Sequence, residues 1–285
     1  MLISGLSALA SRYDALLCDV WGVLHNGREA YPGVADALGN FRAKGGHVLL
    51  LSNAPRPSTA LPEMFRRLGI PSDVYDGILT SGDATRTYLA SRALGEACYY
   101  IGPDRDLNLF DGTGVTCVDE ADAEFILATG PFDDEVEGPE DYREQFGKFA
   151  ARKLPFVCAN PDIVVERGTK HIYCAGALAA LYEELGGEVV YFGKPHRPIY
   201  EVARGRLAEI AGAPVADARI LAIGDGPMTD IMGANDAGID ALFITGGIAA
   251  ADCGPAPEKP EGPRVAAVLA RAGVAAVGAM PRLVW

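Results

Sequence analysis

Short apolar runs that each end in a polar or glycine-containing turn are the feature that most constrains the fold of this chain. Such runs, bounded by turn residues, are typical of the buried strands of a parallel sheet. The turns that follow them contain Asp19, Ser52-Asn53, Gly193-Lys194 and Gly224-Asp225. Because the carboxyl ends of parallel strands share one crevice, we expect polar side chains far apart in sequence to converge there: Asp19, Ser52, Lys194, Asp225 and Asp230.

These residue types suit the transfer of a phosphoryl group. Asp19 can act as a carboxylate nucleophile that forms an aspartyl-phosphate. Three carboxylates in one crevice would repel each other without a hard cation, and Mg2+ prefers such oxygen ligands. Asp19 and Asp225 are the expected ligands, with Asp230 binding through water or orienting the site. Ser52 and Asn53 would bind the phosphate oxygens, and Lys194 would neutralise their charge.

The order of these motifs, with Gly233–Ile239 after the acidic one, resembles the haloacid dehalogenase superfamily. The resemblance is to its class IIA, NagD-like and 4-nitrophenylphosphatase-like branch, and it extends from about Leu16 to Gly247. It implies that Asp19 is the nucleophile and that the backbone carbonyl of Trp21 joins Asp19, Asp225 and Asp230 as a ligand of Mg2+. It also implies that Ser52 and Asn53 bind phosphate and that Lys194 is the catalytic cation.

The expected fold class is α/β, with a Rossmann-like parallel-sheet core and an inserted α/β cap. We expect residues 1–84 and 189–285 to form the core and residues 85–188 the cap. In and before the cap, the apolar spacing predicts strands at Val74–Thr80, Cys98–Ile101, Glu124–Thr129 and Pro155–Ala159. It predicts helices at Ser58–Leu68, Asp83–Ala93, Pro139–Ala151 and Gly176–Leu185.

A cap excludes water and selects the substrate, so specificity should depend on residues outside the core motifs. Asn160 and Asp162, at the end of a predicted cap strand, and the segment Lys170–Tyr173 are candidates for binding substrate. An equally good interpretation is that they are ordinary turn residues.

Trp21 departs from the pattern of the phosphatases in this superfamily. They carry a second Asp at this position, which serves as general acid and base, and a Trp side chain cannot donate that proton. General acid–base help contributes about 10²–10⁴ in rate. His25 is the nearest candidate to replace the acid, although a loop role for it is the simpler interpretation.

The leading hypothesis is therefore a Mg2+-dependent phosphohydrolase that acts on a small cytoplasmic phosphate ester or anhydride. The alternative is a catalytically weak or inactive protein that binds a phosphate ligand, because the acid is replaced by Trp21. A carbon–halogen hydrolase is a further rival, since such enzymes carry an aromatic residue at this position. They work without a metal ion, which disagrees with the acidic residues Asp225 and Asp230.

Composition limits the partners. A formal net charge of −13 opposes nonspecific binding to nucleic acid or anionic membranes. The six cysteines form no Cys-x-x-Cys pair, which indicates a reducing cytoplasm. The segment Met1–Arg12 lacks the pattern of a signal peptide, and no apolar run reaches the ~20 residues of a membrane span. The expected partner is a small phosphorylated metabolite of open identity, and a homodimer is compatible with the pattern.

Overall fold

The computed structural model describes residues 2–167 and 170–285. By its internal contacts the chain divides into two compact units. Unit 1 comprises Met1–Ser52, Leu61–Leu79 and Tyr200–Trp285, and unit 2 comprises Asn53–Ala60 and Thr80–Ile199. The predicted cap spans residues 85–188, whereas the long segment of unit 2 spans Thr80–Ile199. The predicted domain boundaries stay a prediction.

Unit 1 is built on a six-stranded sheet, in which the strand order is β13-β12-β11-β1-β2-β3. The pairs β12–β13, β11–β12, β1–β11 and β1–β2 are parallel. The central strands are buried along their lengths, as expected for a sheet covered on both faces. The strands are β1 (Ala15–Cys18), β2 (His47–Ser52), β3 (Gly77–Thr80), β11 (Ile220–Gly224), β12 (Asp240–Ile244) and β13 (Gly278–Met280).

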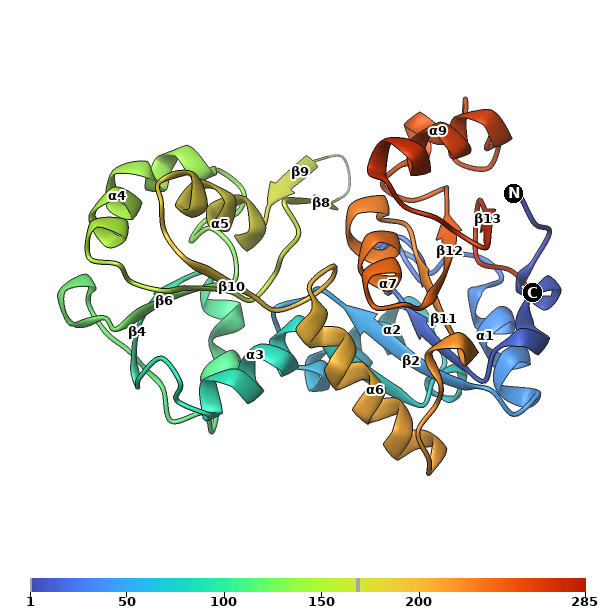
Figure 1. Ribbon diagram of the computed structural model, residues 1–285, viewed down its shortest axis with the longest axis horizontal. Helices are drawn as coiled ribbons and strands as arrows, with labels where there is room; N and C mark the ends of the chain where they lie inside the picture. The colour runs from blue at the N-terminus through green and yellow to red at the C-terminus, as the bar shows by residue number, and fades with distance from the viewer. Residues whose placement is uncertain (1, 168–169) are drawn as a thin grey trace. The chain divides into compact units, whose positions relative to one another are not determined.

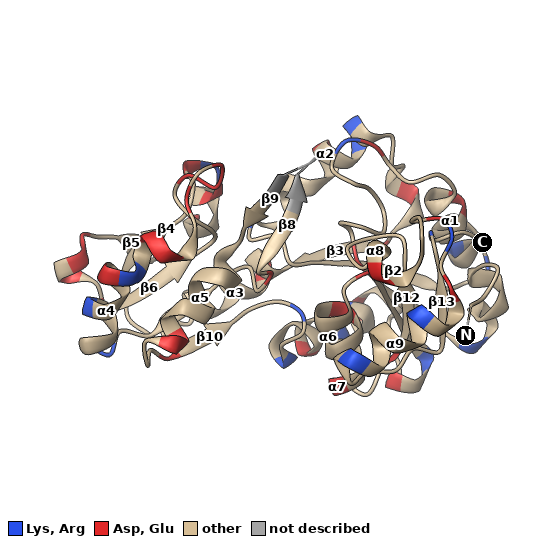
Figure 2. Ribbon diagram, turned by 90° about the horizontal axis from the view of Figure 1, so that it is seen from above, with Lys and Arg blue, Asp and Glu red and all other residues tan. Residues whose placement is uncertain are grey.

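Helices cover both faces of this sheet. Figure 2 shows α1 and α2 on one side of the strands and α6, α7 and α9 on the other. This is the arrangement that right-handed crossovers produce when the strand order reverses next to β1. The helices are α1 (Val34–Ala43), α2 (Leu61–Leu68), α6 (Arg197–Ala211), α7 (Met232–Asp236), α8 (Ala250–Cys253) and α9 (Gly262–Ala272).

Unit 2 is built on a second parallel sheet of five strands, in the order β10-β7-β6-β4-β5. Two further strands, β8 and β9, form a separate antiparallel sheet. The strands are β4 (Ala97–Ile101), β5 (Thr116–Cys117), β6 (Phe125–Ala128), β7 (Phe156–Cys158), β8 (Val164–Arg167), β9 (Lys170–Tyr173) and β10 (Val189–Tyr191). The helices are α3 (Ser81–Ala90), α4 (Arg143–Ala151) and α5 (Ala175–Glu184).

Each face of the second sheet has its own apolar cluster. Figure 1 shows α4 and α5 along one face, where Phe146 and Tyr182 pack on Ile126. On the other face, Leu89 of α3 packs with Cys98. Side chains alternate between the faces of a strand, so neighbouring residues supply both clusters.

The strands and helices that the sequence predicts in and before the cap are present in the structure, although their ends differ by a few residues. The helix expected at Ser58–Leu68 begins as a 3-10 turn, Ser58–Ala60, before α2. The helix expected at Pro139–Ala151 likewise begins as the 3-10 turn Pro139–Tyr142. The strand expected at Val74–Thr80 is shorter, because Ser72–Val74 forms a 3-10 turn. Further 3-10 turns are Leu6–Ala8, Ala10–Arg12, Asp104–Phe110, Glu120–Asp122 and Asp217–Arg219.

Basic and acidic residues are interspersed along the chain, as the blue and red parts of the ribbon in Figure 2 show. On α4, Lys148 forms an ion pair with Glu144, and on α6, Arg206 forms one with Glu209. Among the described residues, none of the helices is long and apolar enough to cross a membrane.

Candidate active site

Asp19 directly follows β1 at the carboxyl edge of the first sheet. Its backbone N–H donates to the carbonyl oxygen of Ile223 at 2.8 Å, which continues the pairing of β1 with β11 by one residue. The Asp19 side chain is 7% exposed. Ser52, the last residue of β2, lies at the same edge and is also buried. Asp19 and Ser52 therefore both lie at the carboxyl edge of this sheet.

Asp225 and Asp230 come from the turn after β11. Asp225 follows the strand directly, and its Oδ2 accepts a hydrogen bond from the backbone N–H of Ile248 at 2.7 Å. Asp230 lies in a single π-helical turn, Pro227–Ile231, and its Oδ2 accepts from the backbone N–H of Gly226 at 3.0 Å. These backbone bonds fix the direction of both carboxylates.

Glycines allow the chain to pass close to these carboxylates. Gly22 has a φ of +82°, and a Cβ there would lie 2.1 Å from Oδ2 of Asp225. A Cβ on Gly224 would lie 2.1 Å from Cβ of Asp230. Any other residue would displace an acid, because such distances lie well inside van der Waals contact. Sequence reasoning missed Gly22 and the backbone of Ile248; the Gly246-Gly247 pair after β12 was an available signal for the latter.

The structure brings the three acids Asp19, Asp225 and Asp230 into one cluster. Carboxylate oxygens of the three lie within 4.8 Å of one another, and all three side chains are buried. Three negative charges held this close repel one another, and a bound cation would offset that repulsion. Oxygen ligands in this number suit a hard divalent ion such as Mg2+. The donor set therefore fits the metal that the sequence predicts.

Trp21 packs within the loop that follows Asp19. Its ring meets the ring of His25 edge to face, with centroids 5.2 Å apart. Gly27, at a φ of +84°, leaves room for the Trp21 ring, because a Cβ there would lie 2.5 Å from it. The side chain thus supports the loop, while the role of its carbonyl as a metal ligand stays a prediction.

His25 is unsuited to replace the missing acid. The side chain is fully buried, and Nδ1 accepts a hydrogen bond from the backbone N–H of Gly27 at 2.9 Å. The proton of the neutral ring therefore lies on Nε2, which is buried and has no hydrogen-bond partner among the described residues. Burial lowers the pKa of His25 to about 4, so the ring is neutral at neutral pH.

Asn53 and Lys194 belong to a second cluster, within unit 2. The Asn53 Nδ2 donates to Oδ1 of Asp162 at 2.8 Å and to the carbonyl oxygen of Lys194 at 3.0 Å. The Lys194 backbone N–H donates to Oδ1 of Asn53 at 2.7 Å. Lys194 is 3% exposed. The Asn53 side chain thus joins two segments of unit 2 that lie far apart in the sequence, and the phosphate-binding role that the sequence predicts for Asn53 stays a prediction.

The candidate substrate residues Asn160 and Asp162 shape one turn. The Asp162 backbone N–H donates to Oδ1 of Asn160 at 3.2 Å, and Asn160 is 7% exposed. Their proposed contacts with substrate stay predictions. The segment Lys170–Tyr173 forms β9, although the side chains of Lys170 and His171 lie outside the described part of the structure.

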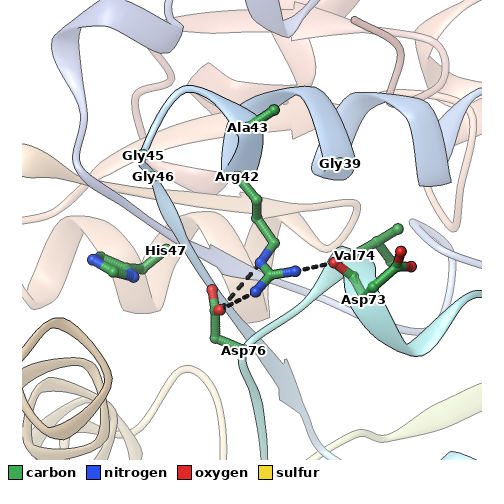
Figure 3. Close-up of a pocket in the computed structure, with 9 residues that line it drawn as sticks. All are labelled: Gly39, Arg42, Ala43, Gly45, Gly46, His47, Asp73, Val74 and Asp76. Carbon is green, nitrogen blue, oxygen red and sulfur yellow. Dashed lines mark hydrogen bonds and ion pairs between the residues drawn. The ribbon is translucent and has the colours of Figure 1, made fainter.

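A hollow of about 510 Å³ lies at the opposite edge of the first sheet, where β2 begins. Figure 3 shows Arg42 at its centre, bonded to the Asp76 carboxylate and to the backbone carbonyl of Asp73. Because the donors of Arg42 are engaged in this way, the hollow is a structural ion-pair site. Asp19, Ser52, Asp225 and Asp230 lie at the other edge of this sheet, where its strands end.

Comparisons with known families agree with the motifs. Residues 16–116 match a family model described as haloacid dehalogenase-like hydrolase, and residues 191–272 match one described as HAD-hydrolase-like. The first match contains Asp19, Trp21 and Ser52, and the second contains Lys194 and both later acids.

Solved structures and curated proteins give the same result. A haloacid dehalogenase-like family hydrolase from Brucella suis 1330 is 44% identical, with a TM-score of 0.88, and the match covers 99% of this chain and 100% of that one. Ribonucleotide monophosphatase NagD from Escherichia coli K12 is 27% identical over 83% of this chain and 89% of its own length. The 5'-nucleotidase YutF from Bacillus subtilis is 24% identical over 83% and 88%, respectively.

Proposed function

The chain belongs to the haloacid dehalogenase-like hydrolase family, and on that premise we propose that it is a Mg2+-dependent phosphohydrolase. Its substrate is a small cytoplasmic phosphate ester or anhydride, and the reaction passes through an aspartyl-phosphate on Asp19. The names of the relatives NagD and YutF, a ribonucleotide monophosphatase and a 5'-nucleotidase, support the class of phosphoric ester hydrolases.

The observation that carries the proposal is the cluster of Asp19, Asp225 and Asp230, whose oxygens lie within 4.8 Å of one another. These carboxylates, with the Trp21 carbonyl, would hold Mg2+. The bound ion would offset the negative charge of the phosphate and of the acids around it.

Asp19 supplies the nucleophile. One of its carboxylate oxygens attacks phosphorus, and the bond from phosphorus to the leaving oxygen breaks. Water then attacks the same phosphorus, which releases inorganic phosphate and restores the carboxylate. Asp225 and Asp230 are held by the backbone N–H groups of Ile248 and Gly226, so neither needs to reorganise during the reaction.

Three further residues complete the proposal. Ser52 ends β2 at the carboxyl edge and would donate to a phosphate oxygen. Lys194, by the family resemblance, would neutralise the phosphoryl charge. Asn53 would bind phosphate together with Ser52, and its side-chain amide, which bonds the Lys194 backbone and Asp162, would also position this lysine.

The need of the leaving group for a proton should determine the rate of hydrolysis at this site. Position 21 offers no proton, and His25 is neutral and buried. We therefore expect efficient cleavage of substrates whose leaving group departs without a proton, such as acyl phosphates, and slow cleavage of alkyl phosphates.

A second candidate function is the binding of a phosphate ligand with little or no turnover. The packing of Trp21 where an acid would be expected favours it. A carbon–halogen hydrolase agrees less well with the structure, because such an enzyme has no need of three clustered carboxylates.

A screen of phosphorylated metabolites with Mg2+, run beside Asp19→Asn, tests the proposal. Phosphate release by the wild type that requires Mg2+ and is lost in Asp19→Asn supports it. Tight binding of a phosphorylated compound without release would instead support the binding protein. Turnover of haloacids in EDTA would support the dehalogenase.

A further inference from the structure

Two cysteines of unit 2 lie side by side on neighbouring parallel strands. Cys98 of β4 and Cys117 of β5 are directly paired in the register of the sheet. The backbone N–H of Val118 donates to the carbonyl oxygen of Cys98 at 2.9 Å, which holds the two strands together at this point. β5 is the edge strand and is only two residues long.

The two thiols are neighbours. Cys98 and Cys117 are directly paired on two parallel strands, so both side chains lie on the same face of the sheet. That face is the one packed by α3, where Cys98 is fully buried among apolar side chains. Cys117 is exposed, whereas the other five cysteines are buried.

The surroundings favour reaction at Cys117. The hydrogen bond from Cys98 lowers the pKa of the Cys117 thiol, which increases its thiolate fraction at neutral pH. The pKa of Cys98 is raised, first by its hydrogen bond to Cys117 and then by burial. One sulfur is thus exposed and activated, and the second lies protected behind it.

The spacing of the strands suits a covalent bond. Neighbouring strands lie about 4.7–4.9 Å apart. Disulfides join residues whose Cα atoms are about 4.4–6.8 Å apart, so directly paired residues need little backbone movement.

We propose that Cys98 and Cys117 form a reversible disulfide, with Cys117 as the attacking thiol and Cys98 as the resolving thiol. The oxidant is a small disulfide. The Cys117 thiolate attacks one of its sulfurs, forms a mixed disulfide and releases the first small thiolate. Cys98 then loses its proton to solvent and attacks the Cys117 sulfur, which releases the second small thiolate. The two protein thiols are oxidised to one disulfide, and the small disulfide is reduced to two thiols.

The cysteine pair is independent of the proposed phosphohydrolase activity. The test of the disulfide and the test of phosphate hydrolysis can therefore succeed or fail separately. The bond would join edge strand β5 covalently to β4.

Titration of the native full-length chain with dithiobisnitrobenzoate tests the proposal. The wild type should release about two equivalents of thionitrobenzoate per chain and lose two hydrogen atoms by intact mass, with no adduct. Dithiothreitol should restore the original mass. Peptide mapping should find Cys98 joined to Cys117.

Two variants separate the roles. Cys98→Ala, and Cys98→Val if the first is poorly folded, should release about one equivalent and retain the adduct on Cys117, because no resolving thiol remains. Cys117→Ser, at an exposed position, should release almost none. A wild type that stops at one equivalent with a stable adduct, or a Cys117→Ser variant that reacts as fast as wild type, would overturn the proposal.

Discussion

The ring of Trp21 lies edge to face against the ring of His25, with 5.2 Å between their centroids. The two residues thus occupy the loop after Asp19 as a packed pair, and neither presents a proton donor of suitable pKa. His25 is buried and neutral, with its pKa lowered to about 4 by burial. The loop that would supply a general acid in the phosphatases is therefore stabilised here by aromatic packing.

The rate of the wild type should depend steeply on the pKa of the leaving group. We expect 4-nitrophenyl and acyl phosphates to be cleaved much faster than alkyl phosphates, because only the latter need a proton. Trp21→Asp should raise the rate selectively for alkyl phosphates, by up to ~10²-fold. Initial rates over a series of leaving groups would measure this.

Folding of Trp21→Asp must be checked first, because loss of a packed aromatic costs up to about 3–5 kcal/mol. Trp21→Phe, which keeps a ring and adds no acid, is the matched control. Equal rates for aryl and alkyl phosphates in the wild type would show that another group donates the proton.

Asn53→Ala should destabilise the protein by about 2–3 kcal/mol, because Asp162 and the backbone of Lys194 lose their hydrogen bonds. Asn53→Asp should cost at least as much at pH 7, since it places a second carboxylate against Asp162. Urea unfolding measures both effects.

The exposed Asn108→Ala is the control, with an expected change within about 0.5 kcal/mol. The extra cost of Asn53→Asp should shrink as the pH falls and the carboxylates become protonated. If Asn53→Asp were as stable as wild type at pH 7, the hydrogen bond to Asp162 would be assigned wrongly.

Asp76 should make stability depend on pH. Burial alone would raise the pKa of Asp76, but hydrogen bonds from Arg42 and from the Val48 backbone, with the charge of Arg42, lower it below the ordinary value. A group with a lowered folded-state pKa stabilises the fold above its unfolded pKa of about 3.9. That stabilisation is lost as the pH falls through the folded-state value.

Asp76→Ala should therefore cost about 1–3 kcal/mol at pH 7. The difference from wild type should be constant above about pH 5 and decrease below about pH 4. Asp76→Asn, which can still accept from Val48, should cost less. Denaturant unfolding from pH 3 to pH 7 checks this, and a difference that grows on acidification would contradict the ion pair shown in Figure 3.

Asp225→Ala should weaken Mg2+ binding, because it removes one of three clustered carboxylates. Calorimetry should show at least a ~10-fold loss of affinity. Asp252→Ala, which removes an exposed carboxylate paired with Arg271, is the control and should leave binding unchanged. Equal losses in the two variants would indicate a nonspecific effect of charge.

Local sequence determined much of the fold. The apolar run Ala15–Cys18 predicts β1, and the polar turn after it places Asp19, because strand and turn are neighbours in the chain. The same reasoning predicted that Asp19, Asp225 and Asp230 would meet, since parallel strands end at a common edge.

Contacts between distant segments could not be predicted in this way. The side-chain amide of Asn53 bonds Asp162, which lies 109 residues away, and no local pattern in the sequence indicates this contact. The burial of His25 depends on packing against Trp21 and Phe65, which fixes its pKa. The two-residue strand β5 is too short to show an apolar period, so the pairing of Cys117 with Cys98 appears only in the fold.

The most direct test of the central claim is the hydrolysis of 4-nitrophenyl phosphate by the wild type and by Asp19→Asn, each with Mg2+ and with EDTA. The claim predicts turnover only by the wild type with Mg2+, and a loss of at least ~10³-fold in Asp19→Asn while its fold is retained. Turnover by Asp19→Asn close to that of the wild type, or equal rates in Mg2+ and EDTA, would contradict it.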